Sequence, residues 1–575
     1  MLTRDKSRIL IFDADAEWCK SVKVLLAGRQ LVADIVTKTF DKCLNKLTEK
    51  VYVSAIINVH DLQDPKADLK RLRTISPSIG IIIVLNQHDP TQDALLWNPD
   101  PLADHSFCKR DHEVTKIGPI AEGLVKNRGL LADDITVVFA DDVDDILTGY
   151  AHTWSGATRI RGDNLSLRFL KTELQLIISR MFHGAESLPI AKTINVEPFG
   201  SEAGHSGSSM FKITPAILIS SARNKSAVLK FGPIDEIRTE AGNYDTYVEW
   251  FLTVDQTVRK IAYAEASRFA AILYSYPRDV VGGYTPYAEY IRTHPVDRCV
   301  SIIEKMFNTK NQHWLSVDGS KFVQKDDLAF QNYYVNKVIH ASLYELRDVH
   351  FQKMCKELNN LERNSSRKIC EVTDSRITFQ DPACSISVIN PMRFIEQPLI
   401  NKIKMTIIHG DLHGHNILID ERDRYFFIDF FYTGFGDIYR DFVELELSVR
   451  YDLFSSRTLP EEERLTSIDS ATVNGKGLFQ LYRLEKALID KTIWDKDPKD
   501  PLIKDNPAMA KAYAIISAIR YYARANCPNY MSIYYMGLAA SSLKALKYFY
   551  PLDVKLSRVI IAALYADLVQ KKAIK

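Results

Sequence analysis

The sequence predicts two domains of different fold class, an α/β domain with a parallel sheet followed by an α+β domain. In residues 8–125, apolar β-branched runs alternate with helical patterns, which is typical of a doubly wound sheet. Farther along, a loop rich in glycine and serine separates two strand patterns within residues 194–213, and a polar loop at residues 409–416 lies between two further strand patterns. A chain of 575 residues is also too long for one hydrophobic core.

The first domain is expected to consist of strands with helices between them. The predicted strands are Arg8–Phe12, Val53–Val59, Ile81–Leu85 and Asp104–Lys109, and a helix is predicted at Glu17–Gly28. The second and third strands are almost continuous apolar, β-branched runs, as expected of strands that are buried on both faces. Residues 126–190 should form a helical connector, because apolar residues recur at helical spacing in 132–154 and 165–181.

The second domain is expected to begin with a hairpin around the loop rich in glycine and serine. Residues 194–199 and 210–213 have strand patterns, and the loop between them contains Gly204, Gly207 and Ser208. Glycine lets backbone N–H groups approach a phosphate closely, because no Cβ obstructs them. The glycine spacing is not G-x-G-x-x-G, so it is the position of the loop in the chain that makes it a candidate for phosphate binding.

A lysine lies in the next strand pattern, Ala227–Gly232. Lys230 resembles the lysine of the kinase V-A-I-K strand, which would hold the α- and β-phosphates of a nucleotide; the alternative is an edge-strand lysine that faces water. A following helix should provide a carboxylate that fixes the ammonium group. Glu240 is our first choice, and Glu249 stays open as its rival.

The polar loop His409–Asn416 is the strongest functional signal in the chain. Strands are predicted on both sides of it, at Lys404–Ile408 and Ile417–Ile419, and a returning strand at Tyr425–Ile428 leads to Asp429. Asp411 can accept the proton of an attacking hydroxyl, and Asn416 and Asp429 offer the hard oxygen ligands that Mg²⁺ prefers. These are the minimum requirements for phosphoryl transfer. The histidines of the loop also suggest zinc, but a loop does not provide the helical spacing that such a motif needs.

The segments HGDLHGHNILID at 409–420 and FFIDFFYTGFGD at 426–437 resemble the catalytic core of aminoglycoside and choline kinase-like phosphotransferases. The resemblance implies a bilobal α+β protein-kinase-like domain that uses ATP and Mg²⁺. In such a domain, Asp411 is the catalytic aspartate, and Asn416 and Asp429 are the metal ligands.

The same resemblance extends to the surrounding residues. His409 would anchor the loop, and Asp437 and Asp441 fit the last two acidic positions of the motif. A bacterial subgroup, the ternary-complex-associated domains, has the same core. The expected division is an amino-terminal lobe at 191–280 and a carboxy-terminal lobe at 281–575, with a β-rich insertion near 368–395.

The order of residues in the first domain, 1–125, resembles a response-regulator receiver, which has a flavodoxin-like fold. Asp13 fits one of the two acidic positions after the first strand, but Ala14 stands where a second acid is expected. Asn58 occupies the phosphoacceptor position, and an amide cannot form an acyl phosphate. Lys109 fits the lysine after the last strand. A receiver-like fold without phosphotransfer chemistry is therefore predicted, in which Asp61 is more simply a loop aspartate than a displaced acceptor.

Composition and charge bear on the expected binding partners and on the expected cellular location of the protein. The formal net charge of +2 gives no signal for nucleic acid or for a membrane surface, and no apolar run reaches membrane-spanning length. The eight cysteines form no C-x-x-C pair, which is typical of free thiols in a reducing compartment, so a cytoplasmic location is expected.

Several functional alternatives stay open at the level of sequence. The first hypothesis is an active phosphotransferase; the others are a nucleotide-binding pseudokinase, a signalling scaffold and a protein kinase. Only a few residues separate Asp429 from Asp437, and Gly410 stands where many protein kinases carry an arginine. Both observations favour a hydroxyl-bearing small molecule as acceptor over a protein. The receiver-like domain could bind a protein partner or form a dimer.

Overall fold

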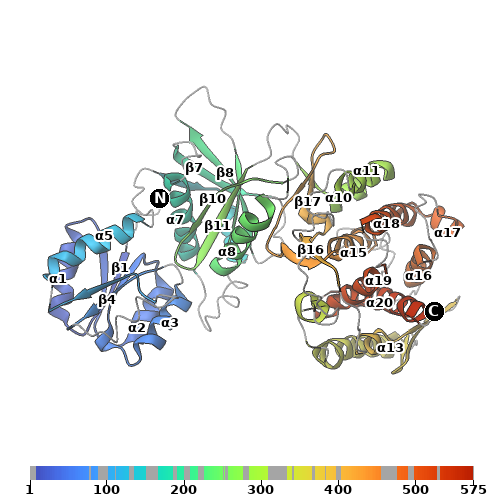
Figure 1. The fold of residues 1–575 in the computed structure, drawn as a ribbon, viewed down its shortest axis with the longest axis horizontal. Helices are drawn as coiled ribbons and strands as arrows, with labels where there is room; N and C mark the ends of the chain where they lie inside the picture. The colour runs from blue at the N-terminus through green and yellow to red at the C-terminus, as the bar shows by residue number, and fades with distance from the viewer. Residues whose placement is uncertain are drawn as a thin grey trace. The chain divides into compact units, whose positions relative to one another are not determined.

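The chain forms two compact units, which are described separately: Met1–Gly242 with Val258–Arg278, and Asn243–Thr257 with Asp279–Lys575 (Figure 1). The computed structural model describes residues 8–76, 79–87, 102–110, 112–127, 135–149, 166–184, 191–199, 208–217, 226–249, 252, 257–275, 284–308, 333–339, 342, 344–365, 370–381, 384–396, 403–454, 476–489, 498–526, 531–548 and 550–573. Among the helices of these residues, none has the length and apolar character needed to cross a bilayer.

The first unit begins with a parallel five-stranded sheet in the order β2-β1-β3-β4-β5. Its strands are β1 (Arg8–Phe12), β2 (Val32–Val36), β3 (Ser54–Asn58), β4 (Gly80–Leu85) and β5 (His105–Cys108). This order is that of the flavodoxin-like folds, to which receiver domains belong. The predicted fold class of the first domain is confirmed.

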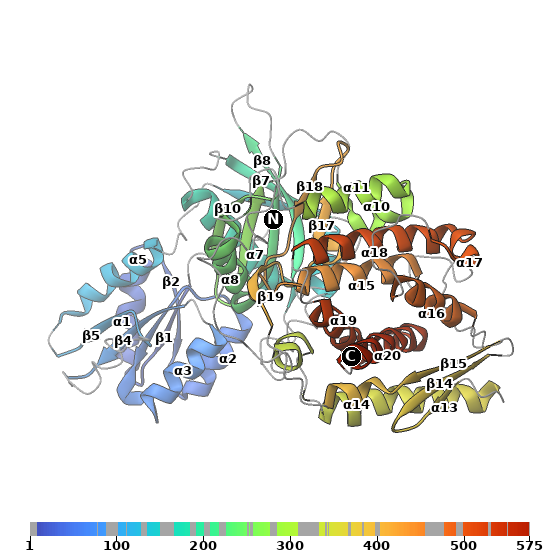
Figure 2. The ribbon, with the colours of Figure 1, turned by 45° about the vertical axis from the view of Figure 1, so that its right-hand side comes forward.

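Helices cover both faces of this sheet, which is why its central strands are apolar throughout. Side chains alternate between the faces along β1, so that Ile9 and Ile11 pack with α1 (Ala16–Ala27) and α5 (Ile117–Asn127). Leu10 and Phe12 pack on the other face with α2 (Phe40–Glu49) and, beside it, α3 (Pro65–Ile75) (Figure 2).

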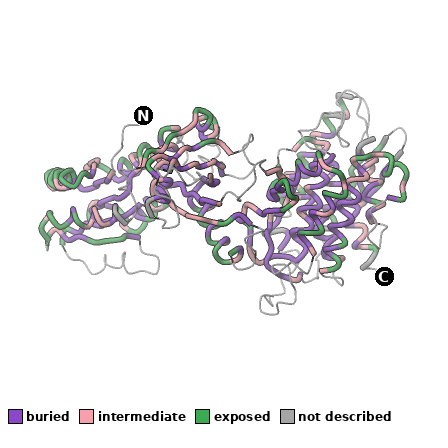
Figure 3. Tube along the Cα trace, turned by 90° about the horizontal axis from the view of Figure 1, so that it is seen from above, coloured by how far each residue is buried: buried purple, intermediate pink, exposed green. Residues whose placement is uncertain are grey.

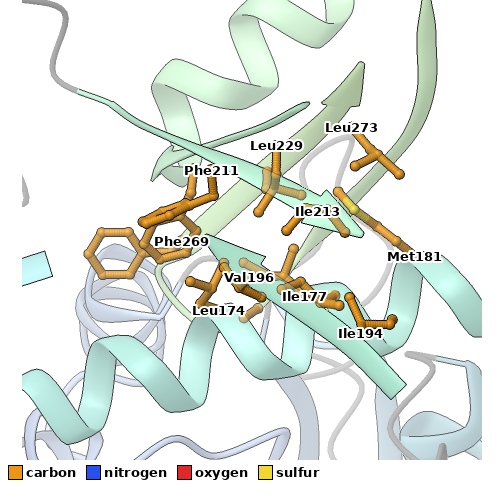
Figure 4. Packing of buried hydrophobic residues seen from close by; sticks show 14 of the residues in the cluster. Leu174, Ile177, Met181, Ile194, Val196, Phe211, Ile213, Leu229, Phe269 and Leu273 are labelled. Atoms are coloured by element: carbon orange, nitrogen blue, oxygen red, sulfur yellow. The ribbon is translucent and has the colours of Figure 1, made fainter. Parts of the chain in front are cut away.

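A mixed six-stranded sheet follows in the same unit, in the order β10-β11-β9-β8-β7-β6. Its strands are β6 (Thr136–Phe139), β7 (Ala191–Pro198), β8 (Ser209–Ile217), β9 (Ala227–Pro233), β10 (Lys260–Glu265) and β11 (Phe269–Ser275). Helix α7 (Leu167–Gly184) packs its apolar side against the sheet through Leu174, Ile177 and Met181 (Figure 4). The strands predicted around the glycine-rich loop and Lys230 are therefore present.

The prediction of a helix across residues 132–154 is wrong at 136–139. These residues form β6, an edge strand that runs parallel to β7, and the chain becomes helical only at 143–149. The run Thr136–Phe139 contains two valines and a threonine, and a β-branched run that finds a free sheet edge is better satisfied as a strand than as a helix. Four residues are too few for periodicity to separate the two states.

The second unit is mainly helical, and its buried residues follow the helices of the interior (Figure 3). The main helices are α10 (Tyr287–Thr293), α11 (Val296–Phe307), α13 (Gln352–Ser365), α15 (Arg440–Phe454), α16 (Lys476–Ile489), α18 (Pro507–Asn526), α19 (Met531–Lys544) and α20 (Leu552–Ala573). The predicted insertion is an antiparallel sheet of β13 (Cys370–Val372), β14 (Arg376–Asp381) and β15 (Cys384–Ile389), and β15 packs against α20.

A cluster of buried charges joins three of these helices. Glu446 and Arg450 of α15, Glu485 of α16 and Arg520 of α18 are all buried. Arg450 contacts both glutamates, at 2.6 Å to Glu446 and 2.5 Å to Glu485, and Arg520 contacts Glu446 at 2.6 Å. Because each charge has an opposite partner, the cluster fixes the mutual packing of α15, α16 and α18.

Two short sheets position the polar loop. Strands β17 (Ile417–Ile419) and β18 (Tyr425–Phe427) form a hairpin with β12 (Thr285–Pro286) beside it, and β16 (Met405–Ile408) pairs with β19 (Gly434–Asp437). The loop therefore leaves β16 and enters β17, and β18 returns the chain to Asp429, as the sequence predicts.

Candidate active site

In the first unit, Lys230 and Glu240 form a buried ion pair. Lys230 is in the middle of β9, between β8 and β11, and its Nζ lies 2.7 Å from Oε2 of Glu240. Glu240 comes from α8 (Ile234–Asn243), and the Tyr274 hydroxyl donates a hydrogen bond of 2.7 Å to its Oε1. Of the two carboxylates that the sequence left open, Glu240 makes the pair, whereas Glu249 is exposed.

Because both side chains are buried, each charge depends on the other for stabilisation. The side chains of Lys230 and Glu240 are 6% and 1% exposed, so either charge alone would be strongly disfavoured there. The pair therefore holds both side chains within the sheet. Gly204 and Gly207 lie outside the described residues; Ser208 is buried at the entrance to β8.

In the second unit, the loop after β16 has a backbone that requires glycine at one position. Gly410 has φ +83°, and a Cβ placed on it would lie 2.3 Å from the carbonyl oxygen of Tyr432. An arginine at this position, as many protein kinases have, would not fit. The next residue, Asp411, has its Oδ2 at 3.6 Å from Nε2 of His413.

Asn416 connects the two ends of the loop. Its Nδ2 donates a hydrogen bond of 2.9 Å to the carbonyl oxygen of Asp411, which leaves Oδ1 as the atom that can coordinate a cation. Its own carbonyl oxygen accepts from the N–H of Ile428 at 3.1 Å, so the loop is bound directly to the residue before Asp429. Asp429 has φ +66°, a left-handed conformation that few residues other than glycine adopt and that often marks functional sites.

The donor set formed by Asn416 and Asp429 fits Mg²⁺. One amide oxygen and one carboxylate are hard ligands, and Mg²⁺ usually takes only one or two protein ligands and completes its shell with water and phosphate. Among the described residues, no group of three or more histidines, cysteines, aspartates or glutamates is arranged to hold a metal ion.

His409 and Asp441 hold the backbone of the loop in place through hydrogen bonds. Asp441, near the start of α15, accepts from the N–H groups of His409 and Gly410, both at 2.8 Å. Burial raises the pKa of Asp441 to about 6, against the lowering effect of these two donors. Nε2 of His409 lies 2.9 Å from the carbonyl oxygen of Ile428, where it can donate. Asp437 is buried in β19, and the Tyr334 hydroxyl donates to it at 2.5 Å, so its contact is structural.

Two residues escaped the sequence analysis, one that contacts the segment after Asp429 and one that contacts Glu240. Nδ2 of Asn243 donates to the carbonyl oxygens of Phe430 and Phe431, at 3.2 and 2.6 Å, and so fixes the segment that follows Asp429. Tyr274 is the second partner of Glu240. Neither belongs to a motif, and their partners are 187, 188 and 34 residues away in the chain, so no local signal points to them.

We expect the buried His409 to make folding sensitive to acid. Burial lowers the pKa of His409 to about 4, whereas in the unfolded chain it stays near 6.5. The unfolded state therefore binds an extra proton as the pH falls below 6.5, and stability should drop by about 2 kcal/mol between pH 7 and pH 5 from this group alone. Urea unfolding of the wild type and of His409→Gln at both pH values measures this loss of stability. The exposed His60→Gln is the control, and equal pH slopes in all three proteins would contradict the prediction.

The receiver-like sheet carries a group of polar side chains at the carboxyl ends of its strands. Nζ of Lys109 lies 2.7 Å from Oδ2 of Asp13 and 4.4 Å from the ring centre of Trp18. At the phosphoacceptor position, Nδ2 of Asn58 donates to Asn86 at 3.2 Å, and its Oδ1 accepts from the N–H of His60. The amide is therefore held from both ends in a neutral hydrogen-bonded arrangement.

The whole chain should not be phosphorylated on this domain by acetyl phosphate and Mg²⁺. An amide at position 58 cannot form an acyl phosphate, and the carboxylate of Asp61 already accepts a hydrogen bond of 2.7 Å from the N–H of Ala14. Intact mass followed by peptide mapping checks this. A stoichiometric adduct on residues 8–125 that disappears in Asp61→Asn or Asp13→Asn would show that the domain is a working receiver.

Comparisons with protein families and with solved structures find partial similarities. A family profile described as "Ternary complex associated domain 9" matches residues 306–546. Among solved structures, a CheY-like receiver protein from Methanospirillum hungatei JF-1 is similar to 21% of this chain and 95% of its own, at 20% identity and a TM-score of 0.19. Choline kinase LicA from Streptococcus pneumoniae is similar over 65% of this chain and 93% of its own, at 13% identity and a TM-score of 0.27.

Aminoglycoside phosphotransferase APH(3'')-Id from Streptomyces rimosus ATCC10970 is similar over 45% of this chain and 79% of its own, at 13% identity and a TM-score of 0.24. A comparison with curated protein sequences finds no match. The chain itself contains a parallel five-stranded sheet, a mixed six-stranded sheet and a mainly helical second unit.

Proposed function

We propose that the protein is an ATP- and Mg²⁺-dependent phosphotransferase that transfers the γ-phosphoryl group to a hydroxyl acceptor. The observation that carries the proposal is the loop in which the Asn416 amide is bonded to the backbone of Asp411, 2.9 Å away. This bond orients the amide oxygen and fixes the peptide that carries the carboxylate, so a proton acceptor and a cation ligand are held in one rigid turn. Positioning of this kind is most of what phosphoryl transfer requires of a protein.

Each residue then has a defined role. The carboxylate of Asp411 accepts the proton of the acceptor hydroxyl as its oxygen bonds to the γ-phosphorus and the bond to the β-phosphate oxygen breaks; the products are ADP and the phosphorylated acceptor. Asn416 and Asp429 would hold Mg²⁺, which neutralises charge on the phosphates when bound. Lys230 would bind the α- and β-phosphates, and Glu240 would keep its ammonium group in place.

The setting of the loop favours a small-molecule acceptor. Asp429 and Asp437 are separated by seven residues, 430–436, of which 434–436 belong to β19, so there is no room for a long activation segment. Gly410 also excludes the arginine that would pair with a phosphorylated segment. The receiver-like domain would then serve as an interaction or regulatory domain. Six cysteines of the described residues are free, which fits a cytoplasmic enzyme.

A thermal-shift and turnover screen with ATP and Mg²⁺ tests the proposal. We expect Mg²⁺-ATP to stabilise the intact protein and to be consumed when a hydroxyl acceptor is supplied. Lys230→Ala and Glu240→Gln should both weaken nucleotide binding, about tenfold or more, because each leaves a buried charge without its partner. Glu249→Gln, an exposed carboxylate, is the matched control and should be silent. Binding without turnover would support a pseudokinase, and absence of both in a folded protein would refute the proposal.

A further inference from the structure

The turn between β10 and β11, residues 266–268, is held by hydrogen bonds from its backbone to a buried carboxylate. The carboxylate of Glu173, from α7, is fully buried and accepts from three consecutive N–H groups, those of Ser267, Arg268 and Phe269, at 3.1, 2.8 and 3.0 Å. A carboxylate that is buried in this way fixes the turn in one conformation, because any other would leave its charge without donors.

The receiver-like domain contacts this turn directly, within the same compact unit. The guanidinium group of Arg268 is buried and donates a hydrogen bond of 2.9 Å to the carbonyl oxygen of Leu47, near the end of α2. The hydroxyl of Ser76, at the end of α3, donates to the carbonyl oxygen of Ser267 at 3.3 Å. Val51 of the receiver-like domain also packs against the hydrophobic core beneath the second sheet.

The same turn supports the helix that carries Glu240. The N–H of Ile234, the first residue of α8, donates to the carbonyl oxygen of Arg268 at 3.0 Å. One turn along α8, Arg238 forms a two-point ion pair with Glu265, the last residue of β10, at 2.8 and 2.9 Å. The start of α8 is therefore fastened to the end of the hairpin that the receiver-like domain contacts.

A second connection runs through β11. This strand begins at Phe269, directly after the turn, and carries Tyr274, whose hydroxyl binds Glu240. The turn thus reaches Glu240 by two routes, along α8 and along β11. Both routes consist of hydrogen bonds, ion pairs and regular secondary structure, which are the kinds of contact that can carry coupling between two places in a protein.

We propose that Arg268 is a positioning residue through which the receiver-like domain holds α8, and with it the Lys230–Glu240 pair, in place. The catalytic consequence rests on the proposed function; the mechanical link does not. Leu47 and Ser76 lie at the carboxyl ends of their helices, and in a parallel α/β sheet these ends are on the side opposite to the carboxyl ends of the strands. The contact is therefore on the opposite side of the sheet from Asp13 and Asn58 and needs no phosphorylation.

Hydrogen exchange of the full-length protein without nucleotide tests the link. Arg268→Ala removes the bond to Leu47 but keeps the backbone carbonyl that receives the Ile234 N–H. We expect amides in α8 and in residues 266–269 to exchange about tenfold faster in this variant. Arg268→Lys, which retains a cationic donor, should restore part of the protection. Arg259→Ala, an exposed arginine at the other end of the same hairpin, is the matched control and should change nothing.

The outcomes separate the two proposals. Unchanged exchange in a folded Arg268→Ala protein would overturn the link. If that variant does not fold, Ser76→Ala decides, because it removes only one side-chain hydrogen bond; faster exchange in α8 supports the link, and no change overturns it. Faster exchange in a protein that neither binds nor consumes ATP would uphold the link and refute the phosphotransferase. Where turnover exists, Arg268→Ala should raise KM for ATP more than it lowers kcat.

Discussion

Replacing Asp411 with asparagine should lower phosphoryl transfer by about 10²- to 10⁴-fold and leave the fold intact. The two side chains have the same shape, but the amide cannot accept a proton from the attacking hydroxyl, and general-base catalysis contributes about this much. The hydrogen bond from Asn416 to the carbonyl oxygen of residue 411 is a backbone contact and survives the change. Affinity for Mg²⁺-ATP, measured by calorimetry, should therefore change little while kcat collapses.

The control for this variant is Glu421→Gln. Glu421 is an exposed carboxylate in the turn of the β17–β18 hairpin, so its removal changes the charge of the same region by the same amount. Wild-type turnover in a folded Asp411→Asn protein would remove Asp411 from the mechanism.

Replacing Asp429 with alanine should reduce turnover by about 10³-fold or more, by a different route. Loss of one of the two proposed cation ligands removes charge neutralisation on the phosphates, which supplies several kcal/mol to the transition state. Unlike Asp411→Asn, this variant should also lose the part of nucleotide stabilisation that depends on Mg²⁺. A thermal shift measured with ATP, with and without Mg²⁺, distinguishes the two variants.

Asp429→Asn is a useful companion, because asparagine tolerates the left-handed backbone at this position better than alanine does. Asp374→Ala removes an exposed aspartate from the β-rich insertion and should leave both measurements unchanged. If Asp429→Ala turns over ATP at the wild-type rate, the proposed metal site is wrong.

Sequence and structure agree best where the chemistry is local. The loop from His409 to Asn416 and the hairpin that leads to Asp429 could be predicted because their strands, turns and polar residues follow one another closely in the sequence. The requirement for glycine at position 410 could not, because it depends on the carbonyl group of Tyr432, which the fold brings against it. The choice between Glu240 and Glu249 likewise depended on which one faces β9.

The contrast between local patterns and contacts distant in the chain also explains the other differences between prediction and structure. Strand β6 was missed because four residues carry too little pattern, and its pairing partner β7 lies more than fifty residues later. The fold class of both parts followed from longer patterns: alternating strands and helices in the first, and a glycine-rich hairpin, a lysine strand and a polar loop in the second. Asn243 and Tyr274 could be recognised only from their contacts.

The contact between Arg268 and Leu47 has a practical consequence for work on this protein. A fragment that begins after residue 125 would keep all residues of the proposed active site, yet it would lack the carbonyl oxygen that Arg268 binds and the side chain of Val51 that covers part of the hydrophobic core. Such a fragment would be a poor substitute for the whole chain in a search for acceptors or inhibitors. A negative result with it would reflect the loss of these contacts and would not test the proposed phosphoryl transfer.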